Sequence, residues 1–179
     1  MNKFLIFKNI IHCENIASTN DYAKKLIKDN VIQENSIVFA ENQIQGKGRY
    51  GNRWYSEKDK SLTFSFVLFM NFNFNKIKYL EKMVLKNIKT VLEHNGVNSR
   101  IKLPNDIYYD KQKLGGILLE NKLSKYTIIG VGLNINNTKY PYWVPNPVSL
   151  KQIIGKNISI EKIFNEVCVA FEKDYLLMQ

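Results

Sequence analysis

The stretch ENQIQGKGRYGNRWYS, at residues 41–56, combines residue types that could bind an anion. Its glycines, its basic residues and the tryptophan near its end are Gly46, Gly48, Gly51, Lys47, Arg49, Arg53 and Trp54. Glycine lets backbone amides come close to a ligand. The guanidinium of Arg49 is a flat fork of donors that matches phosphate or carboxylate. We therefore predict a flap that becomes ordered over an anion. The alternative is a solvated surface turn.

Polar residues that could face a small ligand precede this loop. Ser18, Thr19 and Asn20 lie where a helix is predicted to begin, and Gln43 comes just before the glycines. One residue of the three is enough to cap a helix. Three consecutive hydrogen-bonding side chains could cap the helix and also hold a small polar ligand.

Lys102 lies at the end of a short apolar strand, in the segment IKLPND at 101–106. Strand alternation puts Lys102 on the face opposite Ile101 and Leu103, and Pro104 ends the strand pairing. A lysine at a strand end can equally be an ordinary surface residue, so its chemistry depends on what lies beside it.

Three further features lie downstream of the lysine. Asn105 follows the proline, Gly115 and Gly116 interrupt an apolar strand, and Asn134 ends the next strand. Glycines inside a strand mark a bulge or a ligand lying against the backbone. Each feature is weak alone. Together with the basic loop and Lys102 they describe a cleft with a basic flap, an internal lysine and glycine walls.

The elements that position these residues are strands and helices with short connections. Strands are predicted at 3–11, 36–42, 61–70, 99–103 and 126–135, with a hairpin that turns at 110–112. Helices are predicted to start at 18–20, to span 76–95, to follow the proline-rich loop after 137, and to start at Ser159. Gly96 is placed to end the 76–95 helix. We expect one α+β domain at 1–179, a mixed, largely antiparallel sheet with helices packed on one side.

The composition limits the functional classes. The 179 residues include 45% hydrophobic and 12% aromatic residues, which is typical of a folded chain rather than a disordered one. The net charge of +10 suggests a negatively charged partner. The lysines are scattered, so they do not by themselves indicate nucleic-acid binding. Cys13, Cys168, His12 and His94 lie far apart in the sequence, which argues against a disulfide scaffold or a metal held by protein ligands. No apolar run has membrane-spanning length, and we expect a cytoplasmic protein.

Five motifs, taken in order, resemble the catalytic domain of biotin–protein ligase, or biotin–[acetyl-CoA-carboxylase] ligase. They are STN, Q-x-x-G-K-G-R-x-G-x-R-W-x-S, K-x-P-N-D, K-L-G-G-I-L-x-E and G-x-G-L-N-I-N, and the resemblance spans residues 12–175. It implies a fold related to class II aminoacyl-tRNA synthetases. It also implies an enzyme that uses Mg²⁺ and joins biotin to ATP, giving biotinyl-5′-AMP and pyrophosphate. The biotinyl group then passes to a lysine of a biotin carboxyl carrier protein, a subunit of acetyl-CoA carboxylase.

The resemblance implies a role for each matching residue. The biotin-binding residues would be Ser18, Thr19, Asn20, Gln43, Gly46, Lys47, Gly48, Arg49, Lys102, Gly115 and Gly116. The nucleotide-binding residues would be Lys47, Arg49, Arg53, Trp54, Asn105 and Asn134. Lys102 and Arg49 would be catalytic, with Lys102 at the biotin carboxyl and the α-phosphate. A homodimer is compatible with the resemblance, because relatives often pair their sheets edge to edge.

The chain also departs from the family pattern. Leu103 replaces the usual tryptophan, which we interpret as a substitution in the core, and Lys47, Tyr50 and Asn52 stand where relatives often have arginines. The loop residues are expected to weaken adenylate retention or to change how the loop orders. We expect neither an N-terminal DNA-binding domain nor a small C-terminal β-domain, and therefore no repressor function. Trp143 and the segment 147–155 are candidates for a lid over the adenine.

Three alternatives remain open at this point. The first is lipoate–protein ligase, although its Arg- and Gly-rich signature with a following histidine is not visible here. The second is a non-catalytic module that binds biotin or a nucleotide. The third is a basic nucleic-acid-binding protein, for which aromatic stacking residues interleaved with the basic loop would be expected.

Overall fold

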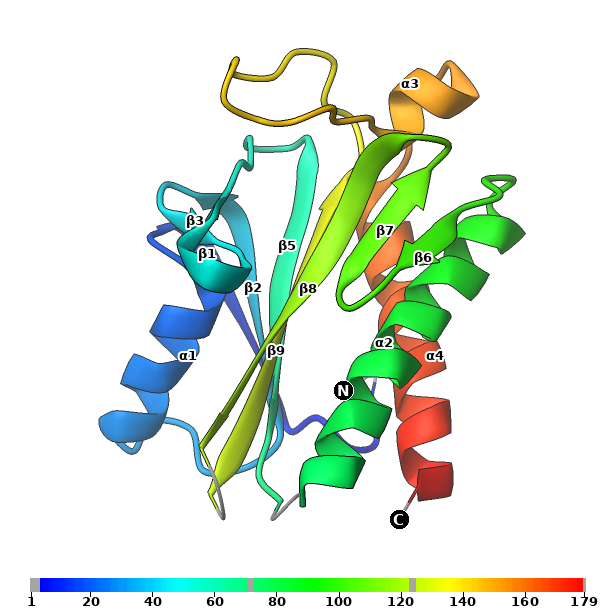
Figure 1. Cartoon of the computed structure of the whole chain (residues 1–179). Coiled ribbons are helices and arrows are strands. Elements are labelled where there is room, and N and C mark those ends of the chain that lie inside the picture. Colours follow the sequence, from blue (N-terminus) through cyan, green and yellow to red (C-terminus); the bar gives the residue numbers. More distant parts are fainter. Residues whose placement is uncertain (1–3, 71–72, 123–124, 179) are drawn as a thin grey trace.

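The structure is a computed structural model, and it describes residues 4–70, 73–122 and 125–178. Its centre is a seven-stranded sheet with the strand order β1-β2-β5-β9-β8-β7-β6 (Figure 1). The strands are β1 (Asn9–Ile16), β2 (Ser36–Gln43), β5 (Ser61–Leu68), β6 (Arg100–Lys102), β7 (Asp106–Tyr109), β8 (Gln112–Lys122) and β9 (Tyr126–Asn134). β1 and β2 are parallel, and the other neighbouring pairs are antiparallel. The prediction of a mixed, largely antiparallel sheet is confirmed.

Two long helices cover one face of this sheet. α2 (Phe74–His94) and α4 (Ile160–Met178) run side by side on that face (Figure 1). Phe66 of β5 stacks on Phe171 of α4 with ring centroids 4.2 Å apart, and Leu80 and Val84 of α2 are fully buried in the same cluster. Burial of this apolar surface is the main favourable contribution to folding. The helix predicted at 76–95 is confirmed as α2, and Gly96 follows it with a φ of +82°.

The remaining long helix, α1 (Thr19–Lys28), lies on the opposite face. Ala23 and Leu26 of α1 are buried with Val38 and Val67 in a second, smaller apolar cluster. The expectation that helices pack on one side is therefore corrected: α2 and α4 form that layer, and α1 adds a helix on the other side (Figure 1). A short helix, α3 (Leu150–Ile154), follows the proline-containing loop as predicted.

Small residues continue the sheet face beyond the part that α1 covers. Ser65 of β5 is paired with Gly130 of β9, and Thr63 is paired with Gly132. Because side chains alternate along a strand, these four residues share the α1 face with Val67. The start of α1 therefore borders a stretch of sheet that has little side-chain volume, and a ligand can lie there.

The chain start differs from the predicted strand at 3–11. β1 begins only at Asn9, and Lys3 lies outside the described residues. Phe4 and Phe7 are instead buried in the larger core, where Phe7 stacks on Phe66 with centroids 5.1 Å apart. The apolar residues that predicted a strand are used for packing before the strand begins.

The helices that follow Ser18 and Ser159 begin where they are predicted to begin, but only one of the two serines caps its helix through its side chain. Ser159 caps α4 through a bond from the Lys162 amide to its Oγ at 3.1 Å. Ser18 occupies the N-cap position of α1, but its side chain makes no capping bond.

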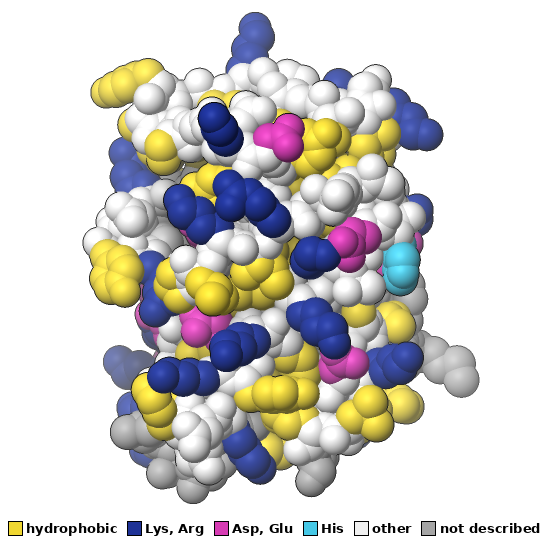
Figure 2. All heavy atoms as spheres, turned by 45° about the vertical axis from the view of Figure 1, so that its right-hand side comes forward, with side chains coloured by type: hydrophobic (Ala, Val, Ile, Leu, Met, Phe, Trp, Pro, Cys, Tyr) yellow, Lys and Arg dark blue, Asp and Glu magenta, His cyan; other side chains and the backbone are white. Residues whose placement is uncertain are grey.

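On one face of the molecule, the basic residues form no single dominant stripe (Figure 2). Figure 2 shows Lys and Arg side chains spread over one face, with hydrophobic and neutral side chains between them. In the part of the chain that the structure describes, no helix is both long enough and apolar enough to span a membrane.

Candidate active site

A cavity of about 250 Å³ opens on the α1 face of the sheet. It lies between the start of α1, the flap, and strands β8 and β9. The predicted residues that line it are Ser18, Thr19, Asn20, Gln43, Lys47, Gly48, Arg49, Arg53, Trp54, Asn105 and Gly116. The fold therefore brings eleven of the predicted residues, from five separate segments, to one cavity.

Glycines on β8 and β9 make the room for this cavity. A Cβ at Gly130 would lie 2.5 Å from the Asn20 Oδ1 atom, and a Cβ at Gly132 would lie 2.6 Å from the Trp54 ring. At Gly116 it would lie 2.9 Å from the Asp106 Oδ1 atom. Each distance is well inside van der Waals contact, so a side chain at any of the three would displace a residue that lines the cavity.

Gly115 has a different role from its neighbour. A Cβ there would run into the side chain of Leu133 and lie 2.6 Å from the Gly132 carbonyl oxygen. Leu133 belongs to the larger core. Gly115 thus permits close packing against β9 and does not line the cavity, so the structure does not bring it together with the other predicted residues.

The polar end of the cavity is built by the helix start and the end of β2. The Thr19 amide and the Thr19 hydroxyl both donate to the Gln43 Oε1 atom, at 2.7 and 3.1 Å. The Ser56 hydroxyl accepts from the Gln43 backbone amide at 2.8 Å and so holds the end of β2. The two bonds from Thr19 fix the Gln43 carboxamide, and its nitrogen then faces the region of the glycine loop, where Gly46 lies close to it.

Asn20 holds the opposite wall. Its side-chain nitrogen donates to the Leu118 carbonyl at 3.1 Å and to Glu120 Oε2 at 2.8 Å, and its oxygen accepts from the Ser65 hydroxyl at 2.7 Å. Asn20 is only 2% exposed. It therefore ties α1 to β8 and β5 and shapes the cavity.

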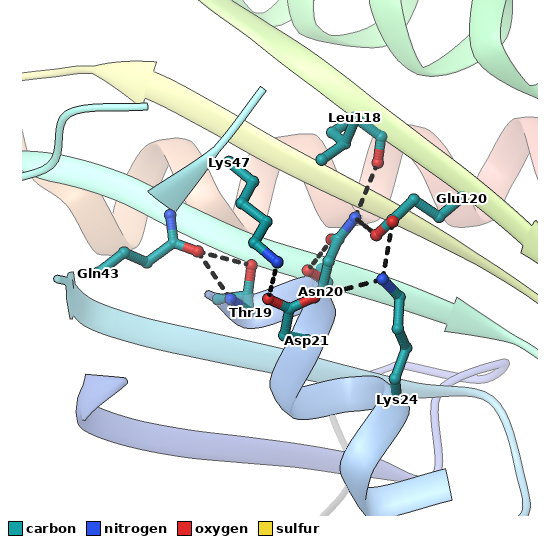
Figure 3. A network of polar contacts seen from close by, with 9 residues as sticks. Thr19, Asn20, Asp21, Lys24, Gln43, Lys47, Leu118 and Glu120 are labelled. Carbon is teal, nitrogen blue, oxygen red and sulfur yellow. Dashed lines mark hydrogen bonds and ion pairs between the residues drawn. The ribbon is translucent and has the colours of Figure 1, made fainter. Parts of the chain in front are cut away.

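A chain of charges extends from this wall to the flap (Figure 3). Lys47 pairs with Asp21 at 2.5 Å, and Lys24 bridges Asp21 and Glu120 at 3.3 and 2.7 Å. Burial by itself raises the pKa of Asp21, but the hydrogen bonds and charges of Lys47 and Lys24 outweigh it, and the pKa lies below its ordinary value. Asp21 is thus held as a carboxylate between two cations.

The flap itself is a short hairpin. β3 (Gly46–Lys47) pairs with β4 (Arg53–Trp54), and a single 3₁₀ turn at Arg49–Gly51 joins them. A Cβ at Gly46 would lie 2.6 Å from the Trp54 carbonyl oxygen, so this glycine allows the two strands to pair. Gly46 does not line the cavity. Whether a bound anion orders the flap further stays a prediction.

Lys102 lies outside the cavity. Its side chain is exposed and its Nζ lies 4.7 Å from the centre of the Tyr108 ring. Leu103 is 67% exposed, so the interpretation of this residue as a core substitution is wrong. The strand β6 is an edge strand of the sheet, and its first and last residues, Arg100 and Lys102, are exposed.

Lys113, rather than Lys102, is the lysine of this part of the sheet that lines the cavity. Its ammonium lies 2.7 Å from the Asp106 carboxylate. Sequence reasoning gave neither residue a role in the site, although the motifs K-x-P-N-D and K-L-G-G-I-L-x-E contain them. The sequence held one signal, because Lys113 precedes the two glycines by two positions. The direction of its side chain depends on the β7–β8 pairing, in which Lys113 lies opposite Tyr108.

A second cavity of about 460 Å³ lies next to the first. The two cavities share Asn52, Arg53, Trp54 and Lys113. The second one is also lined by Asn134 and Trp143, and the Arg53 guanidinium lies 4.5 Å from the centre of the Trp143 ring. The structure thus brings three predicted nucleotide-binding residues together with the predicted lid tryptophan.

The glycines of β9 were also missed as wall residues. Gly130 and Gly132 are two positions apart in a strand, so both lie on the same face. That spacing was visible in the sequence as G-x-G before LNIN.

A model of the biotin/lipoate A/B protein ligase family matches residues 13–136. The chain belongs to this family.

Within the family, the chain is similar to biotin–protein ligases. It is 28% identical over 178 residues to the bifunctional ligase/repressor BirA of Bacillus subtilis, a match that covers 94% of this chain and 54% of that protein. It is 34% identical over 113 residues to the biotin–protein ligase of Homo sapiens, covering 57% of this chain and 15% of that one. The chain spans about half the length of the BirA proteins it matches.

A solved structure gives the same result for the fold. The biotin protein ligase from Aquifex aeolicus in complex with biotin and ATP matches with a TM-score of 0.78 and 26% identity, covering 93% of this chain and 70% of that chain. The expected fold, related to class II aminoacyl-tRNA synthetases, is confirmed.

Proposed function

We propose that the chain adenylates biotin with ATP and transfers the biotinyl group to a lysine of a biotin carboxyl carrier protein of acetyl-CoA carboxylase, in the cytoplasm. The observation that carries the proposal is the pair of adjoining cavities that share Lys113 and Arg53. The first cavity has the polar groups of Thr19 and Gln43 at one end, and the second has an aromatic wall that includes Trp54 and Trp143. Biotin would occupy the first cavity and ATP the second, so that the reacting groups meet at the shared residues.

The first step joins two anions. A biotin carboxylate oxygen attacks the α-phosphorus of ATP, the bond from that phosphorus to the β-bridging oxygen breaks, and pyrophosphate leaves with the electron pair. Lys113, Lys47 and Arg49 all line the first cavity, and their positive charge would offset the repulsion. One such donor aimed at the developing charge commonly contributes about 3–4 kcal/mol to transition-state stabilisation.

Magnesium fits the donors that are present. Mg²⁺ usually takes one or two carboxylates and completes its shell with substrate phosphates and water. Asp106 supplies a carboxylate in the first cavity, and Asn134 supplies an amide in the second. In the described chain no cluster of three or more His, Cys, Asp or Glu could hold a metal by itself, so the ion would arrive with ATP. When bound, it would neutralise phosphate charge.

The polar end of the first cavity favours biotin over lipoate. Thr19 and Gln43 present hydrogen-bonding groups there. The ureido group of biotin can use such partners, whereas the dithiolane ring of lipoate cannot. Lipoate remains the second candidate, because the matching family includes lipoate ligases.

The second step needs a neutral amine. The carrier lysine attacks the carbonyl carbon of the mixed anhydride, the bond to the phosphate oxygen breaks, AMP leaves, and the amine loses a proton as the amide forms. The anhydride is open to hydrolysis, so the flap would also exclude water until the carrier arrives.

Pyrophosphate release from Mg-ATP tests the proposal, measured with biotin, with lipoate and with neither. Release with biotin alone, followed by biotinylation of a purified carrier domain, is the expected result. Release with lipoate instead would assign the second candidate. Biotin binding by calorimetry without pyrophosphate release would leave a non-catalytic binding module.

A further inference from the structure

Arg49 of the flap is held by a residue that lies outside both cavities. The Arg49 NH1 atom lies 3.1 Å from the Glu81 Oε1 atom, and the two side chains are 31% and 22% exposed. Glu81 belongs to α2, the helix that packs on the opposite face of the sheet from α1. Arg49 lines the first cavity, whereas Glu81 lines neither. The ion pair therefore reaches from the cavity across to the far helix layer.

We infer that Glu81 is a positioning residue for the adenylation step, which it would affect only by fixing the Arg49 guanidinium at the cavity. The inference rests on the proposed function and deepens it. Glu81 would touch neither biotin nor ATP, and its effect would come from the ordering of Arg49.

Local hydrogen bonds shape the turn beside Arg49, and the Glu81 pair ties this turn and the arginine side chain to α2. The Gly48 amide donates to the Asn52 carbonyl at 2.7 Å, and the Asn52 amide donates to the Arg49 carbonyl at 3.1 Å. These bonds close the tip of the flap into a tight turn. An arginine side chain still has large rotamer freedom, and ordering it costs up to about 2 kcal/mol. The ion pair with Glu81 orders the Arg49 side chain in part before a ligand binds, so less entropy is lost on binding.

The pair leaves Arg49 able to bind an anion. A guanidinium has five N–H donors in a planar fork, and the contact with Glu81 uses NH1. The other donors remain for a phosphate or a carboxylate in the cavity. Glu81 is thus suited to orient Arg49 without replacing the ligand.

Shielding makes this pair more effective than an ordinary surface pair. Lys58 and Glu41, for comparison, pair at 3.0 Å with side chains 51% and 40% exposed. Exposed pairs of that kind contribute little, because water and salt screen them. The Arg49–Glu81 pair is less exposed and so is screened less.

A second ion pair holds the same flap to α1, the helix on the other face of the sheet. Lys47 pairs with Asp21 of α1 at 2.5 Å. The flap is therefore held by carboxylates from helices on both faces of the sheet. Loss of Glu81 would leave Lys47 in place and free only the Arg49 end, which makes the effect of Glu81 separable.

Glu81→Gln is the test, because it keeps the shape of the side chain and removes its charge. Glu93→Gln is the matched control, since Glu93 is on the same helix, pairs with Lys89 by an i,i+4 contact and lies far from the flap in sequence. Two measurements are made on each variant and on the wild type. One is amide hydrogen exchange of residues 46–54 without added ligand, and the other is KM and kcat for ATP in biotin-dependent pyrophosphate release.

For Glu81→Gln we expect faster amide exchange at residues 46–54. We also expect the KM for ATP to rise on the order of 10-fold, which is less than the roughly 100-fold loss of rate when a reacting group is displaced by 1 Å. The change in kcat should be smaller, and Glu81→Asp should recover part of the affinity. In an Arg49→Ala background, Glu81→Gln should cause no further loss of ATP binding measured by calorimetry.

The inference is overturned if Glu81→Gln matches the wild type in both exchange and KM, or if it weakens ATP binding equally with and without Arg49. A wild type that releases no pyrophosphate with biotin would overturn the proposed function instead. The exchange measurement would still decide whether Glu81 orders the flap, so the two failures are distinguishable.

Discussion

The Lys113 ammonium lies 2.7 Å from the Asp106 carboxylate, and Lys113 borders both cavities. Lys102 is paired with Asp106 across the β6–β7 ladder and so lies on the same face of the sheet. The two lysines are neighbours of one carboxylate. They differ in surroundings, because Lys113 lines both cavities, whereas Lys102 is exposed and its ammonium lies 4.7 Å from the centre of the Tyr108 ring.

Alanine variants of these two lysines should therefore differ in effect. Lys113→Ala should lower the rate of biotin-dependent pyrophosphate release by about 100- to 1,000-fold, the usual cost of losing a donor aimed at transition-state charge. Lys102→Ala should cost much less. Lys122→Ala is the control, because Lys122 lies at the far end of the same strand, β8. A loss at Lys102 equal to the loss at Lys113 would restore the role that the sequence motif gave to Lys102.

Arg49 offers a second test of the charge at the cavity. Arg49→Ala should lower adenylation strongly, and Arg49→Lys should restore little, because an ammonium cannot reproduce the planar fork that bonds both Glu81 and an anion. Single-turnover pyrophosphate release would measure the effect. Arg100→Ala is the control, since Arg100 donates to the Asp110 carbonyl away from both cavities. Full activity of Arg49→Lys would show that charge alone is sufficient.

The sequence predicted the elements well where periodicity was strong. The apolar stripe of 76–95 and the alternation of 61–70 became α2 and β5, because both are buried against the core. The first strand was misplaced because Phe4 and Phe7 pack in the core without belonging to a strand. Local pattern cannot distinguish those two uses of an apolar residue.

The sequence predicted only part of the site, again because local pattern does not show which residues meet in space. Motif order indicated the segments that meet, and eleven of the predicted residues do line one cavity. It could not tell which of two lysines faces inward, because this depends on the β7–β8 pairing, which shifts register between Ile107 and Tyr108. Nor could it pair Arg49 with Glu81, which lie 32 residues apart.

Gly130→Ala should damage the first cavity through Asn20. The added Cβ would lie 2.5 Å from the Asn20 Oδ1 atom, which must then give up its bond to Ser65. Such overpacking typically costs about 1–3 kcal/mol of stability, and biotin affinity should fall with it. Urea unfolding and calorimetry measure the two effects.

Asn20→Ala removes the clash, so the double variant provides the control for Gly130→Ala. Its loss of stability should be smaller than the sum of the two single losses, because the residues are in contact. Additive losses would mean that Gly130 acts through another neighbour.

Asp21→Asn should change stability in a pH-dependent way. The Asp21 pKa is below its ordinary value: burial raises it, but Lys47 and Lys24 lower it more. A carboxyl with a lowered pKa in the folded state stabilises the protein above its unfolded pKa, about 3.9 for Asp, and loses that contribution as the pH falls through the folded pKa. The wild type should therefore have the larger free energy of unfolding at pH 7, and the difference from Asp21→Asn should shrink steadily below about pH 4.

Urea unfolding at several pH values measures this difference in the free energy of unfolding. Asp29→Asn is the control, because Asp29 is exposed just after the same helix. A difference that stays constant down to low pH would mean that the amide changes packing and that the ion pairs of Asp21 contribute nothing measurable.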